Sequence, residues 1–376
     1  MLNSQEIINT IALTHINYFH LTGMLQLYRR MGSATAVIEH RNNIKDVIPD
    51  ASPKLITSLQ QLDEPLHRAE VELEWDEAHG IMPLCMNDEN YPQRLKECDD
   101  APLMLFYKGN INLNQRRVIC IVGTRRNTMY GEDLIRRFIT ELKQLCPQLL
   151  IVSGLAYGVD IIAHRQALHN GYPTVGVLAH GLDYLYPARH KQTADEMVHK
   201  GGLLTEFLTQ TNADKINFVR RNRIVAGISD ACIVVESAAH GGGLITASLA
   251  RTYNREVFAF PGNVGSQYSE GCNNLIRDNV AGLINNASDF IKCMGWDEDA
   301  KLQKAQQVGI ERQLFPELSA EELKVVNVLT KRNDLQINML SIQADIPISH
   351  LTATLFSLEM KGVVKTLPGG VYHLLR

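Results

Sequence analysis

The stretch that decides the fold is VICIVGTRR, residues 118–126. Its first five residues, 118–122, are all apolar, and they end at a glycine, Gly123. A short apolar run that stops at glycine is typical of a strand buried on both faces of a parallel sheet. Residues 134–145 then repeat apolar side chains at helical spacing. Strand, glycine turn and helix in this order predict the first unit of a doubly wound α/β sheet.

The same stretch carries the first indication of a ligand. Thr124, Arg125 and Arg126 follow Gly123 at the carboxyl end of the strand, where doubly wound sheets bind their ligands. Free backbone N–H groups and guanidinium groups both bind anions. We therefore expect an anion, most simply a phosphate, at this strand end.

Five further apolar runs predict the other strands of the sheet, and each ends at a small or polar residue. Helical periodicity follows most of them, which is typical of right-handed crossovers between parallel strands. The five runs are Leu149–Val152, Thr174–Leu178, Gly202–Thr205, Ala231–Val235 and Val257–Phe260. Residues 81–86 and 101–109 precede the sheet as a strand and an edge segment. Together they predict an extended Rossmann-like, doubly wound α/β fold.

The 376 residues divide into four parts. Residues 1–80 are expected to form a small helical domain of helix-hairpin-helix or SAM-like type, ending in an acidic, solvated connector helix over 64–79. A packing or dimerisation role is the alternative for this domain. Residues 81–292 form the Rossmann-like domain. Residues 293–316 are polar with little periodicity and are predicted as a linker.

The last part, residues 317–376, shows three helical patterns followed by a hairpin, which predicts a winged-helix domain. Six acidic and six basic residues cancel over this range, and the third helix, 349–361, has no arginine. A winged helix that reads DNA needs cations for the phosphates. We therefore expect protein contact or a structural role here rather than DNA reading.

Composition excludes several classes of protein. The chain is 45% hydrophobic and 21% charged with a net charge of −4, which fits a globular protein and argues against a broadly basic nucleic-acid coat. Seven cysteines without C-x-x-C spacing are expected to be reduced packing residues in a cytoplasmic protein. We expect no signal peptide, no membrane span, no metal and no cofactor.

Small residues follow the second strand in SGLAYGVD, residues 153–160, and let a ligand approach the backbone closely. The next helix carries Asp160 and His164 one turn apart. They are either an acid–base pair or a packed polar contact, and we favour the contact because no nucleophile is signalled nearby. After the third strand, Arg189 and Lys191 could reach a phosphate beside tyrosines, with isolated surface charges as the alternative.

The densest positive stretch is KINFVRRNR, residues 215–223. Arg220 and Arg223 share a helix face with Asn217, whereas Arg221 points elsewhere. Cations interleaved with an aromatic residue suit single-stranded nucleic acid, whose phosphates are bound and whose bases stack. A salt-bridged helix is the alternative, and it is weakened because Asp214 is the only acid close by in sequence.

Three consecutive glycines, 241–243, follow the fifth strand and can form an N–H nest for an anion. Glycines also stand at the ends of the first two strands. We therefore expect one phosphate groove across several strand ends. Neither G-x-x-x-x-G-K-[ST] nor G-x-G-x-x-G occurs at these turns, so an ATP P-loop and a dinucleotide fingerprint are not indicated.

At these residues the chain resembles the DNA-processing protein A (DprA, or Smf) family. The similar motifs lie in order between about 90 and 290: YPQRL 91–95, APLMLFYKG 101–109, IVGTRR 121–126, SGLAYGVDIIAH 153–164, GLDYLYP 181–187, FVRRNRIVAG 218–227, GGGLITA 241–247 and FPGN 260–263. The helical N terminus and the winged-helix end resemble family members more loosely.

The resemblance implies that residues 81–292 bind single-stranded DNA, that the chain forms a homodimer, and that RecA recombinase is a partner loaded on incoming DNA during natural transformation. It implies no catalytic residue. The phosphate-binding residues it implies are Gly123, Thr124, Arg125, Ser153, Gly154, Ala156, Phe218, Arg221, Arg223, Gly242 and Gly243, together with Lys191 in the loop after the third strand. Threonine replaces a common serine at 124, and Gly241 and Gly243 stand where serine is frequent.

A second hypothesis is an enzyme, a nucleoside-5′-monophosphate phosphoribohydrolase of the lysine-decarboxylase-like (LOG) type. Those enzymes resemble this chain in their sheet and use a P-G-G-x-G-T-x-x-E motif whose glutamate acts on the ribose. Three residues after Thr246 this chain has Leu249 instead. The carboxylate that the reaction needs is therefore missing from that position.

Overall fold

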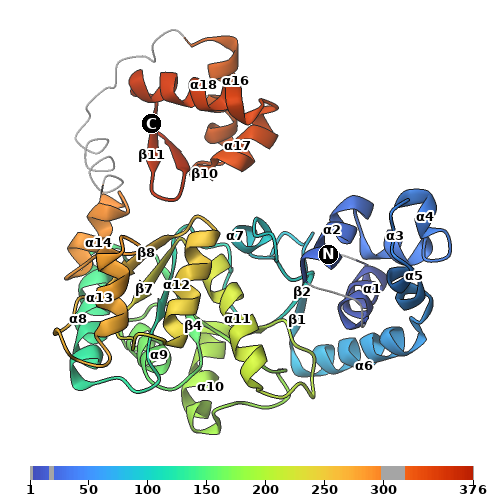
Figure 1. The fold of residues 1–376 in the computed structure, drawn as a ribbon, viewed down its shortest axis with the longest axis horizontal. Coiled ribbons are helices and arrows are strands. Elements are labelled where there is room, and N and C mark those ends of the chain that lie inside the picture. Colours follow the sequence, from blue (N-terminus) through green and yellow to red (C-terminus); the bar gives the residue numbers. More distant parts are fainter. Residues whose placement is uncertain (1–2, 17–20, 298–317, 376) are drawn as a thin grey trace.

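A nine-stranded sheet forms the centre of the molecule (Figure 1). The computed structural model describes residues 3–16, 21–297 and 318–375. The strands run in the order β1-β2-β6-β5-β4-β3-β7-β8-β9. β2 pairs antiparallel with β1 and with β6, and all other neighbours are parallel. The strands are β1 Met82–Cys85, β2 Met104–Gly109, β3 Val118–Val122, β4 Leu150–Gly154, β5 Thr174–Val177, β6 Gly201–Thr205, β7 Ala231–Val234, β8 Glu256–Ala259 and β9 Gly282–Leu283.

The strand order reverses at β3, where the chain moves first toward β4 and later, in the other direction, toward β7. Ligands of such sheets bind outside the carboxyl ends of the strands at this switch point. The doubly wound fold predicted from the sequence is confirmed. The first motif, Val118–Val122, is the strand at which the two halves of the parallel part meet.

Alternate residues of β3 belong to two different cores. Ile119 and Ile121 pack with α8 Met129–Leu145, α9 Val159–His169 and α14 Ala287–Cys293. Val118, Cys120 and Val122 pack on the opposite face, with α11 Lys215–Gly227, α12 Gly242–Thr252 and α13 Glu270–Arg277. Burial on both faces explains why this strand has no polar residue. α7 Gln93–Lys96, η1 Ala188–His190 and α10 Lys191–Lys200 complete the domain.

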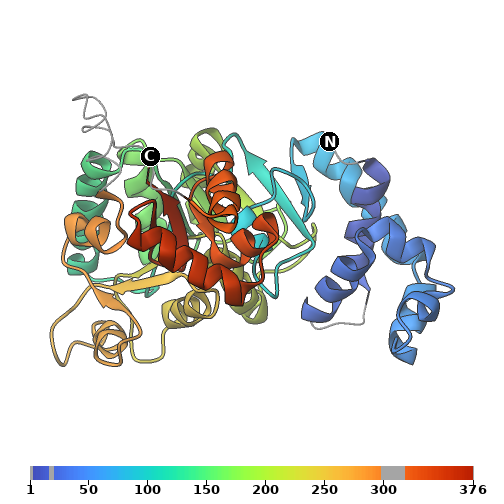
Figure 2. The ribbon, with the colours of Figure 1, turned by 90° about the horizontal axis from the view of Figure 1, so that it is seen from above.

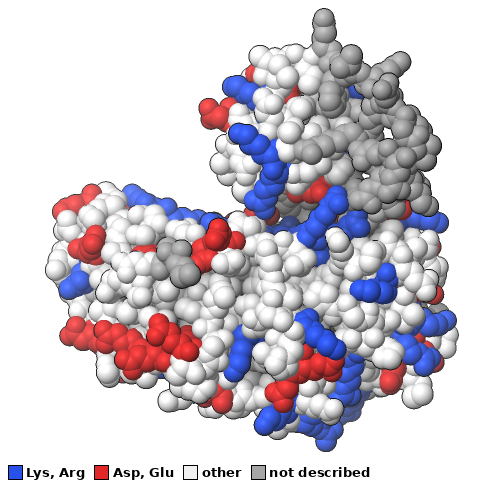
Figure 3. Space-filling view, turned by 180° about the vertical axis from the view of Figure 1, so that it is seen from behind, with Lys and Arg blue, Asp and Glu red and all other residues white. Residues whose placement is uncertain are grey.

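Helices α1 to α6 form the N-terminal region beyond the β1 edge of the sheet (Figures 1 and 2). They span α1 Ser4–His15, α2 Leu21–Met31, α3 Ala34–Glu39, α4 Ile44–Val47, α5 Pro53–Gln60 and α6 Asp63–His79. Acidic side chains gather over α6 on the face shown in Figure 3. The sequence predicts a solvated connector here, and that prediction is wrong for the opposite face of the helix.

On that opposite face, the carboxylate of Glu72 is buried and accepts hydrogen bonds from the backbone N–H of Thr209 at 2.8 Å and from its hydroxyl at 2.5 Å. Asp76 is also buried, and burial raises its pKa to about 8. α6 is therefore a packed helix that connects the N-terminal helices to the sheet domain.

The C-terminal residues form a winged-helix domain as predicted. Its elements are α16 Ala320–Lys331, β10 Leu335–Gln336, α17 Ile337–Ala344, α18 Ile348–Met360, β11 Val364–Leu367 and β12 Val371–Leu374. β10 completes a three-stranded sheet with the hairpin, which the sequence analysis did not anticipate. The predicted linker, 293–316, lies outside the described residues from 298 onward.

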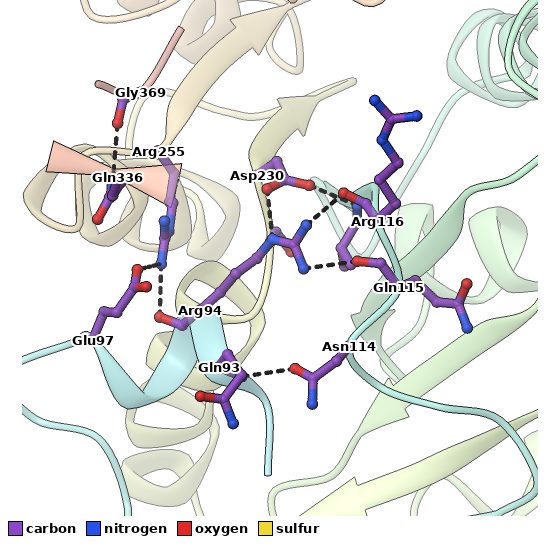
Figure 4. Close-up of polar contacts among 12 residues, drawn as sticks. Gln93, Arg94, Glu97, Asn114, Gln115, Arg116, Asp230, Arg255, Gln336 and Gly369 are labelled. Atoms are coloured by element: carbon purple, nitrogen blue, oxygen red, sulfur yellow. Dashed lines mark hydrogen bonds and ion pairs between the residues drawn. The ribbon is translucent and has the colours of Figure 1, made fainter. Parts of the chain in front are cut away.

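The winged-helix domain contacts the sheet domain at the amino ends of the parallel strands. Arg116, which precedes β3, lies 3.4 Å from the carboxylate of Asp334, and the N–H of Gly369 donates to Glu256 at the start of β8 (2.9 Å). Figure 4 shows the polar side chains that meet there. This domain is therefore at the sheet edge opposite to the carboxyl ends of the strands.

No helix in the described ranges has the length and the apolar character needed to cross a membrane.

Candidate phosphate-binding pocket

A cavity of about 440 Å³ opens at the carboxyl ends of β3, β4 and β7, with α11 and α12 as its walls. It lies at the switch point of the sheet. Nine of the twelve residues predicted to bind phosphate line it: Gly123, Thr124, Arg125, Gly154, Ala156, Phe218, Arg221, Gly242 and Gly243. Segments up to 120 residues apart in the chain thus contribute to one cavity. The other three predicted residues, Ser153, Lys191 and Arg223, lie outside its lining.

Two glycines are needed here because the chain segments approach too closely for a side chain. A Cβ atom on Gly123 would lie 2.7 Å from the carbonyl oxygen of Glu236 and from a methyl carbon of Val159. A Cβ atom on Gly154 would collide with the guanidinium of Arg221 and the carboxylate of Asp160. The glycine turns therefore keep β3, β4 and α11 close enough to share the cavity.

The first turn of α12 supplies backbone donors. The helix begins at Gly242, and no side chain caps its N terminus. The N–H groups of a helix's first turn have no acceptor within the helix, and they attract anions together with the helix dipole. Because Gly241, Gly242 and Gly243 all line the cavity, this end of α12 faces the proposed ligand.

Arg125 is an exposed cation at the mouth of the cavity. Its guanidinium lies 4.7 Å from the centre of the Phe218 ring. Among the residues that the structure describes, no carboxylate forms an ion pair with Arg125. Its charge is therefore available to an anion, and the ring of Phe218 holds the side chain over the cavity.

Arg221 lines the inner wall of the cavity and is buried. Its guanidinium donates to the carbonyl oxygen of Val177, and its Nε donates to the side chain of Asn222 (3.3 Å). Asp160 is buried beside it, and burial raises the pKa of Asp160, although the nearby Arg221 guanidinium acts in the opposite direction. The cavity thus holds one acid against several cations.

Arg223, one of the predicted binding residues, lies in a buried ion pair rather than in the cavity lining. Its guanidinium is buried, lies 2.5 Å from the carboxylate of Glu206, and donates to the carbonyl oxygen of Asp100. Arg220 pairs with the same carboxylate at 2.9 Å. The salt-bridged alternative therefore holds for this face of α11. Spacing along the chain does not reveal this pair, because Glu206 follows β6 and is not a near neighbour of α11 in sequence.

Ser153 and Lys191 are also placed differently from the expectation. Ser153 is fully buried, and its hydroxyl donates to the carbonyl oxygen of Ile121 (2.6 Å), so it ties β4 to β3. Lys191 is exposed as the first residue of α10 and does not line the cavity. A phosphate in the cavity would therefore not meet either side chain directly.

His164 is a packed polar contact, the alternative that we favoured for Asp160 and His164. The ring is fully buried; its Nε2 lies 2.5 Å from the carbonyl oxygen of Gly154 and its Nδ1 lies 2.7 Å from the hydroxyl of Thr174. Burial lowers the pKa of His164 to about 4. The neutral ring therefore supports the turn after β4 rather than transferring protons in the cavity.

The structure adds cavity residues that the sequence analysis did not select. Lys215 and Asn222 line the wall together with Phe218. Their positions, i, i+3 and i+7, share one helix face, and this periodicity was the signal that could have identified them. His240 adds an exposed imidazole at the α12 side. Among the described residues no group of three or more His, Cys, Asp or Glu side chains could hold a metal ion.

The fold defines a Rossmann-like protein with a winged-helix domain, and its cavity is lined by arginines and glycines. A family model described as DNA recombination-mediator protein A matches residues 83–295, and one described as DprA winged helix domain matches residues 311–370. The chain belongs to the DNA recombination-mediator protein A (DprA/Smf) family.

Individual relatives agree with this assignment. Protein Smf of Escherichia coli is 33% identical over 311 residues, which are 79% of this chain and 78% of that protein. The DNA processing protein DprA of Streptococcus pneumoniae is 38% identical over 204 residues, 54% of this chain and 71% of that protein.

Two solved structures are similar in fold. The X-ray structure of DprA from Streptococcus pneumoniae has a TM-score of 0.66 at 30% identity, covering 77% of this chain and 98% of that one. The structure of DprA from Helicobacter pylori, described for its single-stranded DNA binding mode, has a TM-score of 0.52 at 30% identity, covering 58% and 96%.

Proposed function

We propose that this protein binds single-stranded DNA through the cavity at the carboxyl ends of β3, β4 and β7. The observation that carries the proposal is the juxtaposition of Arg125, Arg221 and the uncapped N terminus of α12 around one cavity. Guanidinium groups and helix N termini bind phosphate, and a phosphodiester backbone presents phosphates in series. The Helicobacter pylori relative, which is described as binding single-stranded DNA, supports the same ligand for this chain.

The test is a titration of labelled single- and double-stranded oligonucleotides at 50 and 200 mM salt. Each phosphate neutralised by the protein releases counterions, so affinity for a single strand falls with a slope of about 0.7 per contact in log–log form. We expect single strands to bind more tightly and Arg125→Ala to reduce the slope. Arg126→Ala is the matched control, because Arg126 is the adjacent exposed arginine and does not line the cavity. Unchanged affinity in both Arg125→Ala and Arg221→Ala would defeat the proposal.

We further propose that the bound strand is incoming DNA during natural transformation, that the protein protects it, and that it helps load RecA. Support comes from family membership, since relatives are named DNA processing proteins. The measurement is RecA ATPase activity on single strands covered by single-strand-binding protein, with and without this chain. A homodimer is proposed on the same basis and is tested by light scattering after size exclusion.

We propose that the chain has four parts, namely residues 1–80, 81–292, 293–316 and 317–376, and that the winged helix is a protein-contact or structural domain. The winged helix lies at the amino ends of the parallel β-strands, whereas DNA bound in the cavity would lie at their carboxyl ends. This position supports a role other than DNA reading. Removal of residues 317–376 should leave the affinity for a short single strand within about twofold.

The proposal is for a binding protein and not for an enzyme. The LOG-type alternative needs a glutamate where Leu249 stands on α12, and Leu249 is a partly buried hydrophobic residue packed against the core. Incubation with AMP followed by chromatography distinguishes the two functions. Release of free adenine would favour the enzyme.

A further inference from the structure

Two partly exposed tyrosines adjoin residues that line the cavity. Tyr157 follows the cavity residue Ala156 in the loop after β4 and is 36% exposed. Tyr186 lies in the loop after β5 and is 45% exposed, and its ring centre is 6.0 Å from that of Phe218 at an interplanar angle of 65°. Phe218 itself lines the cavity. Both rings are therefore neighbours of the proposed phosphate site.

The two loops extend the row of strand ends that begins at the cavity. β3, β4 and β5 are adjacent parallel strands, so the segments after them follow one another along the same edge. The η1 turn that follows Tyr186 joins the two rings. The guanidinium carbon of Arg189 lies 5.4 Å from the centre of the Tyr157 ring, and the ring centre of His190 lies 5.1 Å from it.

Neither ring is needed to satisfy a polar contact of the fold. In the part of the chain that the structure describes, the hydroxyls of Tyr157 and Tyr186 make no hydrogen bond, whereas Tyr184 donates to the carbonyl oxygen of Thr211 (3.2 Å). Tyr184 also stacks on His180 at 4.5 Å, with 29° between the rings. Tyr184 is equally exposed, at 37%, but its ring is used within the loop. Tyr157 and Tyr186 meet their neighbours edge-on, at 72° and 65°.

The charge around these rings is positive. Arg189 and Lys191 are exposed, and neither forms an ion pair with a carboxylate among the described residues. The acid of the same loop, Asp183, accepts a hydrogen bond from the N–H of Gln210 (2.9 Å). Exposed aromatic rings flanked by cations are the arrangement that binds unpaired bases and their phosphates.

We propose that Tyr157 and Tyr186 are stacking sites for unpaired nucleobases that flank the phosphate in the cavity, with Arg189 and Lys191 beside the backbone. This inference rests on the proposed function and specifies that the ligand is recognised through its bases as well as its phosphates. It also predicts the path of the bound DNA, which runs from the cavity along the carboxyl ends of β4 and β5.

The experiment compares a 12-nucleotide oligothymidylate with an abasic oligonucleotide of the same length, which has the phosphates but no bases. We expect the wild-type protein to bind the oligothymidylate more tightly. The double variant Tyr157→Ala/Tyr186→Ala should lose about a hundredfold for the oligothymidylate, because each of the two stacked bases contributes on the order of one factor of ten. Its affinity for the abasic strand and its salt slope should not change.

Tyr184→Ala is the matched control, and the double Tyr→Phe variant should bind like the wild type, because the ring and not the hydroxyl is used. Equal losses on both oligonucleotides, or no loss on either, would overturn the stacking sites. If the wild-type protein binds neither oligonucleotide, the proposed function itself fails. Thermal unfolding of each variant shows that a lost affinity is not a lost fold.

Discussion

Arginines lie at both ends of the parallel strands of the central sheet, but they have different partners at the two ends. We call the side with the carboxyl ends of these strands the carboxyl edge and the side with their amino ends the amino edge. At the carboxyl edge, Arg125 has no ion pair among the described residues and lies over the ring of Phe218. At the amino edge, Arg94 lies 2.5 Å from Asp230 and also donates to two backbone carbonyl oxygens. Arg255 lies 3.6 Å from Glu97 at the same edge (Figure 4).

Five arginines line a cavity of about 220 Å³ between the amino edge and the winged helix. Basic side chains are visible at this junction in Figure 3. Asp230, Glu97 and Asp334 pair with three of these arginines, and the Arg116–Asp334 pair joins the two domains. The comparison shows that an arginine's role depends on whether an acid reaches it. Local arginine density alone does not distinguish the two edges.

The same contrast occurs within a single helix. Arg221 on α11 lines the cavity, whereas Arg223, two residues later, is buried against Glu206. Two residues turn an α-helix by more than half a revolution, so the two guanidinium groups face different surroundings. Substitutions at the two kinds of site should therefore separate stability from DNA affinity.

The largest expected effect is on stability, at Arg223. Arg223→Ala leaves the carboxylate of Glu206 buried beside only the half-exposed Arg220, and breaking a buried pair from one side typically costs about 3–5 kcal/mol. Urea unfolding monitored by circular dichroism measures this loss. An unchanged unfolding midpoint together with weaker DNA binding would mean that Arg223 binds DNA, as Arg125 is proposed to do, and does not stabilise the fold.

The next effect is the pH dependence due to His164, which supports the carboxyl edge. Its pKa is lowered to about 4 from 6.5, so the folded protein favours the neutral ring. This contribution is complete above pH 6.5 and is lost as the pH falls toward 4, so the free energy of unfolding decreases over that range. The unfolding free energy of wild type should therefore fall more between pH 7.5 and 4.5 than that of His164→Gln. Equal slopes would contradict the buried neutral ring.

Arg125→Ala tests the carboxyl edge directly. Hydrogen bonds to charged groups contribute about 1.5–3 kcal/mol, which corresponds to a loss of roughly 10- to 150-fold in affinity for a single strand. Stability should change by less than about 0.5 kcal/mol, because the side chain is exposed and has no ion pair. Fluorescence anisotropy and urea unfolding of the same preparation measure both quantities. A large loss of stability without a loss of affinity would reverse the assignment of the two edges.

The smallest effect is expected at the junction with the winged helix. The Arg116–Asp334 pair is half-exposed on the arginine side, and such pairs contribute about 0–1 kcal/mol. Arg116→Gln removes this pair without disturbing the contact between Asp334 and His373 inside the winged helix (2.5 Å), and it should leave single-strand affinity unchanged and only slightly increase proteolysis at the junction. A tenfold change in affinity would show that the two edges of the sheet are coupled.

Asp76 offers a test of the corrected view of α6. Its pKa is raised to about 8, so the folded protein holds a proton that the unfolded chain releases above about 4. Its favourable contribution is therefore complete below pH 3.8 and decreases as the pH rises through 8. Asp76→Asn should increase the unfolding free energy at pH 8.5 relative to wild type. No gain would indicate that Asp76 is solvated, as the sequence alone predicts.

Much of the fold could be predicted from local pattern. Runs such as Val118–Val122 and Ala231–Val235 identify buried parallel strands because a strand covered on both faces excludes polar side chains. The glycine turns identify the strand ends at which segments meet, and the motif set identifies the family. β10 was not predicted, because a two-residue strand has no periodicity of its own.

The sequence by itself determined every described strand except the two-residue strands β9 and β10, and it showed that glycines and arginines gather at the strand ends. Only the tertiary structure decided which of those arginines are free. Arg223 meets Glu206 across the fold, Ser153 bonds to β3, and Glu72 and Asp76 are covered by neighbours distant in the chain. Strand and turn formation depend on residues close in sequence. The availability of a charge depends on whichever side chain the fold brings within about 4 Å of it.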